Sequence, residues 1–218
     1  MKPHFVKNYY SKMFGGIWDR KLFTWKELET LINIRPLMSA PHRVSINGME
    51  QKYTWPNSIW SIDKNCYPPL LLKELIEKYV CTFADMSRST KKINDFAKKL
   101  EEEYNLSADA HIYTCLNPKL GHPFGIHYDY ADNVIVQCEG KTNFKVWEEI
   151  KPDYEGAGVA NVNITVEGNP ILNVDMKPGD VIWIPKYYPH LASSKTSRMS
   201  VSFPLKPGRT QPRDWIKL

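Results

Sequence analysis

The chain has 218 residues, 42% of them hydrophobic and 12% aromatic, and a formal net charge of +5 at pH 7. This composition excludes an intrinsically disordered chain, and the length suits one domain with a substantial core. No run approaches the roughly eighteen apolar residues of a membrane span, and the N-terminus lacks the features of a signal peptide. We therefore expect a cytoplasmic protein with no membrane partner; the mild positive charge leaves a nucleic-acid partner open without indicating one.

The N-terminal half carries amphipathic patterns that predict helices. Thr24 is followed three residues later by Glu27, which is a capping-box pattern, and Pro69 stands at the first turn of another apolar stripe. Apolar residues recur every three or four positions in these stretches. We predict helices over 24–33, 69–80 and 88–105, and a mostly helical part spanning residues 1–108.

After Asn105 the pattern changes to short segments rich in β-branched and aromatic residues, separated by Gly, Pro, Asn and Asp. Strands at this spacing without intervening helices predict a sandwich or barrel. We expect a mainly β fold with an α-helical N-terminal part, a β core over 109–205 and a C-terminal tail over 206–218, all in one domain. The predicted strands lie within 109–117, 133–140, 142–148, 161–168, 170–176, 180–185 and 198–205.

The four cysteines do not form a metal-binding pattern. Cys66, Cys81, Cys115 and Cys138 show no CxxC spacing, which argues against a thiolate zinc site. We expect those within apolar runs to be reduced core residues.

His127 and Asp129 are separated by one residue at the head of an apolar run. On an extended strand this spacing places both side chains on one face. A single histidine is more often structural than a ligand, so a metal site requires a further ligand downstream.

The sequence KPGDVIWIPKYYPH (177–190) supplies that candidate ligand, His190. A Pro-Gly-Asp turn starts an apolar strand, and two prolines then precede the histidine. Two imidazoles and one carboxylate form the ligand set of non-haem Fe(II) oxygenases. A catalytic zinc site more often uses three histidines, or two histidines and a glutamate.

The segments HYDYADNVIVQCEGKTNFKVW (127–147) and MKPGDVIWIPKYYPH (176–190) resemble the cupin-type Fe(II)/2-oxoglutarate oxygenases. The likeness extends over 109–204 and is stronger to the JmjC-like hydroxylases, especially their ribosomal-oxygenase branch. It implies a double-stranded β-helix (jelly-roll) core, with Fe(II) held by His127, Asp129 and His190. It also implies a dioxygenase that uses 2-oxoglutarate to hydroxylate a C–H bond, with a protein or peptide side chain as the favoured substrate.

The chain departs from that family at the expected binding site for the far carboxylate of 2-oxoglutarate. Relatives place a lysine or arginine two residues after a glycine that corresponds to Gly140, whereas this chain has Thr142 there. Arg198, which shares a strand face with Ser200 and Ser202, resembles the Arg-x-Ser of other branches of the superfamily. Lys141 and Lys145 are alternatives, Thr142 could still donate a hydrogen bond, and loss of 2-oxoglutarate binding stays open.

Two further residues are candidates near the co-substrate. The resemblance places Asn133 near the metal-bound end of 2-oxoglutarate, and Tyr113 could offer its hydroxyl group or simply pack in the core. The alternatives are the same chemistry on a free amino acid or small metabolite, and a non-redox metal-binding cupin that acts as an isomerase or sensor. A homodimer is also left open.

Overall fold

The structure of the chain is a computed structural model. It describes residues 2–9, 21–34, 44–46, 49–51, 69–84, 86–118, 124–152 and 164–208. Within these ranges, no helix combines the length and the apolar character needed to cross a membrane.

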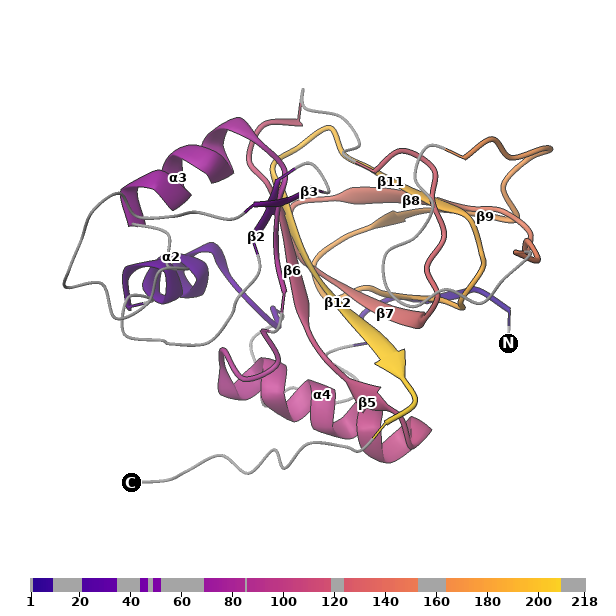
Figure 1. Cartoon of the computed structure of the whole chain (residues 1–218), viewed down its shortest axis with the longest axis horizontal. Helices are drawn as coiled ribbons and strands as arrows, with labels where there is room; N and C mark the ends of the chain where they lie inside the picture. The colour runs from indigo at the N-terminus through magenta and orange to yellow at the C-terminus, as the bar shows by residue number, and fades with distance from the viewer. Residues whose placement is uncertain are drawn as a thin grey trace.

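Two antiparallel sheets form the framework (Figure 1). The large sheet has the order β1-β10-β7-β12-β6-β4-β2-β3, with β5 paired to β12, and the small sheet has the order β11-β8-β9. This arrangement confirms the prediction of a mainly β, jelly-roll fold. The strands of the large sheet are β1 (His4–Val6), β2 (Val44–Ile46), β3 (Met49–Gln51), β4 (Cys81–Phe83), β5 (Ser107–Ala108), β6 (His111–Cys115), β7 (Asp132–Glu139), β10 (Val181–Ile184) and β12 (Arg198–Lys206). Those of the small sheet are β8 (Thr142–Val146), β9 (Leu172–Met176) and β11 (His190–Ser193).

Three described helices lie on the side of the large sheet away from the small sheet: α2 (Trp25–Ile34), α3 (Pro69–Lys78) and α4 (Lys91–Tyr104) (Figure 1). The hydroxyl group of Thr24 accepts a hydrogen bond from the Glu27 backbone and donates one to its carboxylate, so Thr24 caps α2 and supplies its half of the predicted capping box. Thr90 caps α4 by accepting from the Ile93 backbone, and Asn105 ends that helix in the left-handed conformation.

The central strands β7 and β12 are buried on both faces. Val134, Val136, Val201 and Phe203 belong to the core shared with the helices. Ile135, by contrast, packs with residues of the small sheet in a second core. Because side chains alternate along a strand, the other face of β12 presents Arg198, Ser200 and Ser202 toward the space between the sheets.

The structure differs from the predicted elements in three places. Residues 164–168, the described part of the predicted strand 161–168, form no strand. Cys66 lies outside the described residues, so the expectation for that cysteine is not addressed by the structure. The strand β11 was not predicted, because its four residues HLAS carry little β-branched or aromatic character. The N-terminal half also contributes strands to the large sheet, although each has three residues or fewer and is too short to show a period.

A β-bulge interrupts the pairing of β7 with β12 near Gly140. Met199 pairs with Glu139, but the next residue, Ser200, pairs with Gln137, so Cys138 is the extra residue on β7. Gly140 then has φ +64°, and a Cβ atom there would lie 1.9 Å from the carbonyl oxygen of Ser197. The glycine is therefore required by both its backbone conformation and the close approach of the neighbouring chain.

We expect Gly140→Ala to lower the free energy of unfolding by at least about 2 kcal/mol, because conformational strain and a steric clash add. Gly168→Ala is the matched control: its φ is +73°, but nothing lies within 4 Å of a Cβ there. That variant should lose only the conformational contribution, about 1 kcal/mol. Urea denaturation of both variants measures the difference, and equal losses would show that the chain near Ser197 adjusts freely.

Candidate metal and co-substrate site

Two backbone hydrogen bonds join His127 to His190. The N–H of His127 donates to the carbonyl of His190 at 3.1 Å, and the N–H of His190 donates to the carbonyl of His127 at 2.7 Å. Directly paired residues of an antiparallel bridge project their side chains to the same face. The two imidazole rings accordingly lie side by side, with 4.2 Å between their centroids.

Each of the two rings has one nitrogen occupied by the backbone. Nδ1 of His127 is 3.1 Å from the carbonyl oxygen of Gly125, and Nδ1 of His190 is 3.0 Å from that of Tyr188. A carbonyl oxygen only accepts, so Nδ1 carries the proton in both rings. Nε2 therefore keeps its lone pair in both histidines, which is the form that binds a metal.

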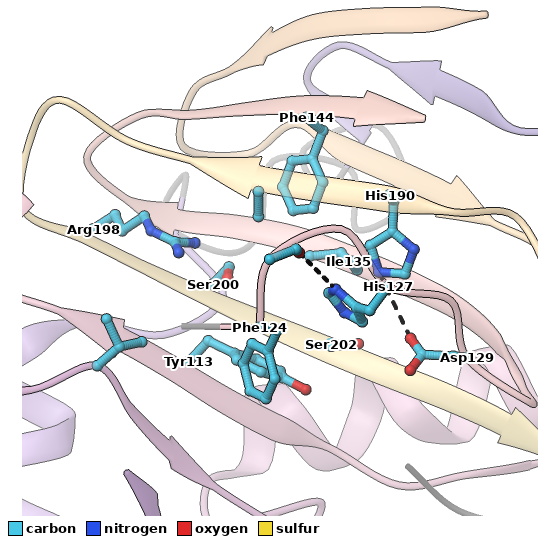
Figure 2. Close-up of a pocket in the computed structure, with 13 residues that line it drawn as sticks. Tyr113, Phe124, His127, Asp129, Ile135, Phe144, His190, Arg198, Ser200 and Ser202 are labelled. Atoms are coloured by element: carbon cyan, nitrogen blue, oxygen red, sulfur yellow. Dashed lines mark hydrogen bonds and ion pairs between the residues drawn. The ribbon is translucent and has the colours of Figure 1, made fainter. Parts of the chain in front are cut away.

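Asp129 completes the cluster. Ligand atoms of His127, Asp129 and His190 all lie within 4.8 Å of one another, and Asp129 Oδ2 is 3.7 Å from His190 Nε2 (Figure 2). Burial and the neighbouring His190 lower the pKa of His127 from 6.5 to about 4, with Asp129 acting in the opposite direction. The His127 imidazole is therefore neutral at pH 7. Two imidazole nitrogens with one carboxylate oxygen fit a divalent transition metal.

The turn before His190 is fastened to the segment that carries Asp129. The N–H of Tyr187 donates to the carbonyl of Asp129 at 2.9 Å, and the N–H of Lys186 donates to the carboxylate of Asp132 at the same distance. Tyr187 has a φ of +67°, a conformation that is unfavourable for a residue with a side chain. The turn between the two prolines is thus held in a strained form that brings His190 close to Asp129.

A cavity extends from this cluster between the two sheets and encloses about 560 Å³, counting its open mouth. Figure 2 shows the His127, Asp129 and His190 cluster on one side of the cavity and Arg198 on the other. Its lining also includes Val80, Tyr113, Phe124, Gly125, Ile135, Phe144, Ala192, Ser200 and Ser202. The wall between the two ends is therefore mainly apolar, with polar groups concentrated at each end.

Arg198 is a buried cation without an anionic partner. It is only 6% exposed, and burial lowers the pKa of its guanidinium, with the Cys115 thiol as its hydrogen-bonding neighbour. Among the residues that the structure describes, no carboxylate forms an ion pair with it. A guanidinium stays protonated under these conditions, so its desolvation is uncompensated unless an anion enters the cavity.

The other predicted co-substrate residues fall into two groups. Thr142 is fully buried, on the strand face it shares with Phe144, and its hydroxyl group has no hydrogen-bond partner. Lys141 is exposed, and Lys145 lies on the opposite face of β8. Neither lysine is among the residues that line the cavity with Arg198, and Thr142 lies behind the lining residues, next to Phe144 on the same strand face.

Asn133 and Tyr113 also lie at the site. The Asn133 side chain donates to Asp129 Oδ2 at 2.7 Å, so it contacts the carboxylate of the cluster. Tyr113 lines the cavity, where its ring packs edge-on against Phe124 at 6.2 Å between centroids. Burial raises the Tyr113 pKa, and the charge of Asp129 raises it further, so the phenol is protonated at neutral pH.

Sequence reasoning missed the apolar wall of the cavity. Phe144 and Ala192 face each other on paired strands of the small sheet, and Ile135 comes from the large sheet. Strand parity indicates that these residues point inward, but it does not distinguish cavity lining from ordinary core. Val80 reaches the cavity from the N-terminal half, and no local pattern marks it.

A family model described as JmjC domain matches residues 85–211, which is more than half of the chain. The chain belongs to the JmjC domain family. The match contains the His127, Asp129 and His190 cluster, Arg198 and every strand of the large sheet from β5 onward. It confirms the family predicted from the two motif segments.

Curated relatives match the JmjC core of this chain over a limited length. The chain is 34% identical over 98 residues to the Aedes aegypti protein named bifunctional lysine-specific demethylase and histidyl-hydroxylase NO66, covering 44% of this chain and 15% of that protein. It is 28% identical over 99 residues to human ribosomal oxygenase 1, again covering 44% and 15%. The matched segment is thus a small part of these relatives.

Solved structures of Escherichia coli YcfD have the same fold as this JmjC protein. One superposes with a TM-score of 0.61 at 16% identity, covering 96% of this chain and 50% of that chain. Another, described as a ribosomal oxygenase in complex with cobalt and 2-oxoglutarate, superposes with a TM-score of 0.59 at 16% identity and covers 96% and 49%. The fold likeness therefore extends beyond the JmjC match into the N-terminal half.

The uncompensated burial of Arg198 leads to a prediction about stability. We expect Arg198→Met to raise the free energy of unfolding of the ligand-free protein by about 1 to 3 kcal/mol, because an apolar chain of similar length replaces a desolvated charge. Lys145→Met, on the outward face of β8, is the control and should change it by less than about 0.5 kcal/mol. Urea denaturation tests this, and a clear loss of stability in Arg198→Met would mean that the guanidinium is satisfied within the protein.

Proposed function

We propose that this JmjC protein is an Fe(II)- and 2-oxoglutarate-dependent dioxygenase that hydroxylates a C–H bond of a protein or peptide side chain. The observation that carries the proposal is the pairing of two groups in one cavity. A three-residue candidate metal cluster lies at one end, and a buried arginine with no anionic partner among the described residues lies at the other. A small dicarboxylate that also binds metal satisfies both ends.

His127, Asp129 and His190 are the residues that would hold the metal. Two imidazole nitrogens and one carboxylate are the ligand set of non-haem Fe(II) oxygenases. When bound there, Fe(II) and 2-oxoglutarate supply the oxidising power for C–H hydroxylation, with 2-oxoglutarate converted to succinate and carbon dioxide. The carbonyl groups of Gly125 and Tyr188 keep the imidazoles in the required tautomer.

Arg198 would bind the far carboxylate of 2-oxoglutarate, assisted by the hydroxyl groups of Ser200 and Thr142. Charge-assisted hydrogen bonds from a guanidinium to a carboxylate are stronger than neutral ones, and they gain further strength in a cavity with little water. The unpartnered Thr142 hydroxyl fits the same role, because a buried donor without an acceptor is costly. Lys141 is exposed and Lys145 lies on the other face of β8 from Phe144, which favours Arg198 over either lysine.

The apolar wall of the cavity would exclude water from the reacting groups. Phe144, Ile135 and Ala192 line the space between the two ends, and Phe124 packs near His127 with 5.4 Å between ring centroids. Exclusion of bulk water limits unproductive side reactions of an oxidising intermediate. Tyr113 would present a protonated hydroxyl group beside Asp129.

The substrate class is supported by the relatives' names, which describe histidyl hydroxylation and ribosomal oxygenases. Because this chain matches only part of those proteins, their substrates do not transfer directly. A protein or peptide side chain is the substrate we propose. The cytoplasmic location and a homodimer stay predictions from the sequence.

Binding of a co-substrate analogue tests the two-ended site. We expect Mn(II) together with N-oxalylglycine, an inert analogue of 2-oxoglutarate, to raise the unfolding midpoint by several degrees, more than either alone, since both bind only the folded protein. Arg198→Ala should lose the contribution of the analogue and keep that of Mn(II). Lys141→Ala and Lys145→Ala are the controls and should respond as the wild type does; loss of the response in a lysine variant instead would reassign the carboxylate-binding residue.

Turnover tests the chemistry and the substrate class together. Wild-type protein with Fe(II), 2-oxoglutarate, isotopically heavy dioxygen and a cell extract should form succinate and incorporate one heavy oxygen atom into a peptide found by mass spectrometry. His127→Ala should form neither above background, because a ligand of the metal is lost. Label in the metabolite fraction alone would identify a small-molecule oxygenase, and tight metal binding without succinate formation would identify a non-redox cupin.

A further inference from the structure

Two buried polar residues, Ser202 and Asn133, form a hydrogen-bonded chain from β12 to Asp129 of the metal-binding cluster. Ser202 Oγ donates to Asn133 Oδ1 at 3.0 Å, and Asn133 Nδ2 donates to Asp129 Oδ2 at 2.7 Å. Ser202 and Asn133 are 4% and 6% exposed. Solvent therefore does not compete effectively for these hydrogen bonds.

The sheet register explains why these residues meet. On β7, Asn133 pairs with Pro204 of β12, and Ile135 pairs with Ser202. Ser202 and Asn133 are thus diagonal neighbours on one face of the sheet, within reach of each other's polar side chains. The face is the one that opens to the cavity, where Ser202 is a lining residue.

The partners of Asn133 fix the orientation of its amide. Nδ2 lies 2.7 Å from the Asp129 carboxylate and 3.3 Å from the carbonyl oxygen of Ala131, and both of these groups only accept hydrogen bonds. The amino group must therefore face them, and the amide oxygen must face Ser202. A rotated amide would direct its oxygen at the carboxylate, so that two acceptors would face each other.

We propose that Ser202 is a positioning residue that acts through Asn133 to hold the Asp129 carboxylate in place for metal binding. The inference rests on the proposed function, because it assigns Ser202 to the support of the metal ligand Asp129. The serine hydroxyl anchors the amide through its oxygen, and the amide in turn restricts the carboxylate to the side that faces His190. Groups that orient metal ligands in this way commonly change metal affinity by about 10- to 100-fold.

Metal affinity, measured without co-substrate, tests this role separately from activity. Mn(II) binding is followed by electron paramagnetic resonance of the free ion in wild-type protein, Ser202→Ala, Asn133→Ala and the double variant. We expect the dissociation constant to rise about tenfold in Ser202→Ala and at least as much in Asn133→Ala. Because Ser202 acts through Asn133, the double variant should bind no more weakly than Asn133→Ala.

Two comparison variants separate positioning from a general effect on the fold. Ser202→Thr keeps the hydroxyl group and should therefore retain most of the wild-type Mn(II) affinity. Ser200→Ala removes a hydroxyl group from the same face of the same strand, at 2% exposure, but Ser200 has no bond to Asn133. We expect it to leave Mn(II) affinity unchanged while it weakens binding of N-oxalylglycine.

The possible failures are distinguishable. Undiminished Mn(II) binding in Ser202→Ala, or a loss that adds fully to that of Asn133→Ala, would overturn the role of Ser202 and leave the proposed function standing. Wild-type protein that binds Mn(II) no better than His127→Ala would overturn the proposed function and this inference together. A loss of Mn(II) affinity in Ser202→Ala supports the inference when Ser202→Thr retains that affinity. The unfolding midpoints of the metal-free variants show whether the fold itself is affected.

Discussion

The paired backbone hydrogen bonds between His127 and His190 are the constraint on which the site depends. They join two segments that are more than sixty positions apart, one leading into β7 of the large sheet and the other starting β11 of the small sheet. With that pairing in place, both imidazoles project to one side. The Nδ1–H group of each ring donates a hydrogen bond to the carbonyl group two residues before it. The metal-binding geometry is thus a property of the backbone bridge between the sheets, which side chains alone would not secure.

The rest of the molecule supports this bridge from two directions. The helices α2 and α4 cover the outer face of the large sheet and keep β7 and β12 buried on both sides. The strained turn at Tyr187 fastens the approach to His190 onto Asp129 and Asp132. Strain of this kind persists only where surrounding contacts determine the conformation, and at this turn those contacts include the carbonyl of Asp129, a member of the cluster.

The sequence was sufficient for the parts of the site that depend on local spacing. One residue between His127 and Asp129 places them together, and the parity of β12 brings Arg198 and Ser200 to one face; the structure has both arrangements. Features that depend on the pairing of segments distant in the chain could not be predicted from the sequence. The contact of Asn133 with Asp129 depends on a side-chain orientation, and the reach of Ser202 to Asn133 depends on the register of β12 against β7. The strand β11 and the cavity residue Val80 likewise follow from tertiary contacts that have no local signature.

The bulge at Cys138 has a consequence for the charge of the cavity. Continued without interruption, the register of β12 against β7 would set Arg198 directly opposite Glu139, with both side chains in the space between the sheets. The extra residue turns Glu139 to the helix side, where its carboxylate pairs with Lys21 at 2.6 Å. An internal counter-ion is thereby withheld from Arg198. One inserted residue in a strand therefore leaves the Arg198 guanidinium at the cavity without Glu139 as its counter-ion.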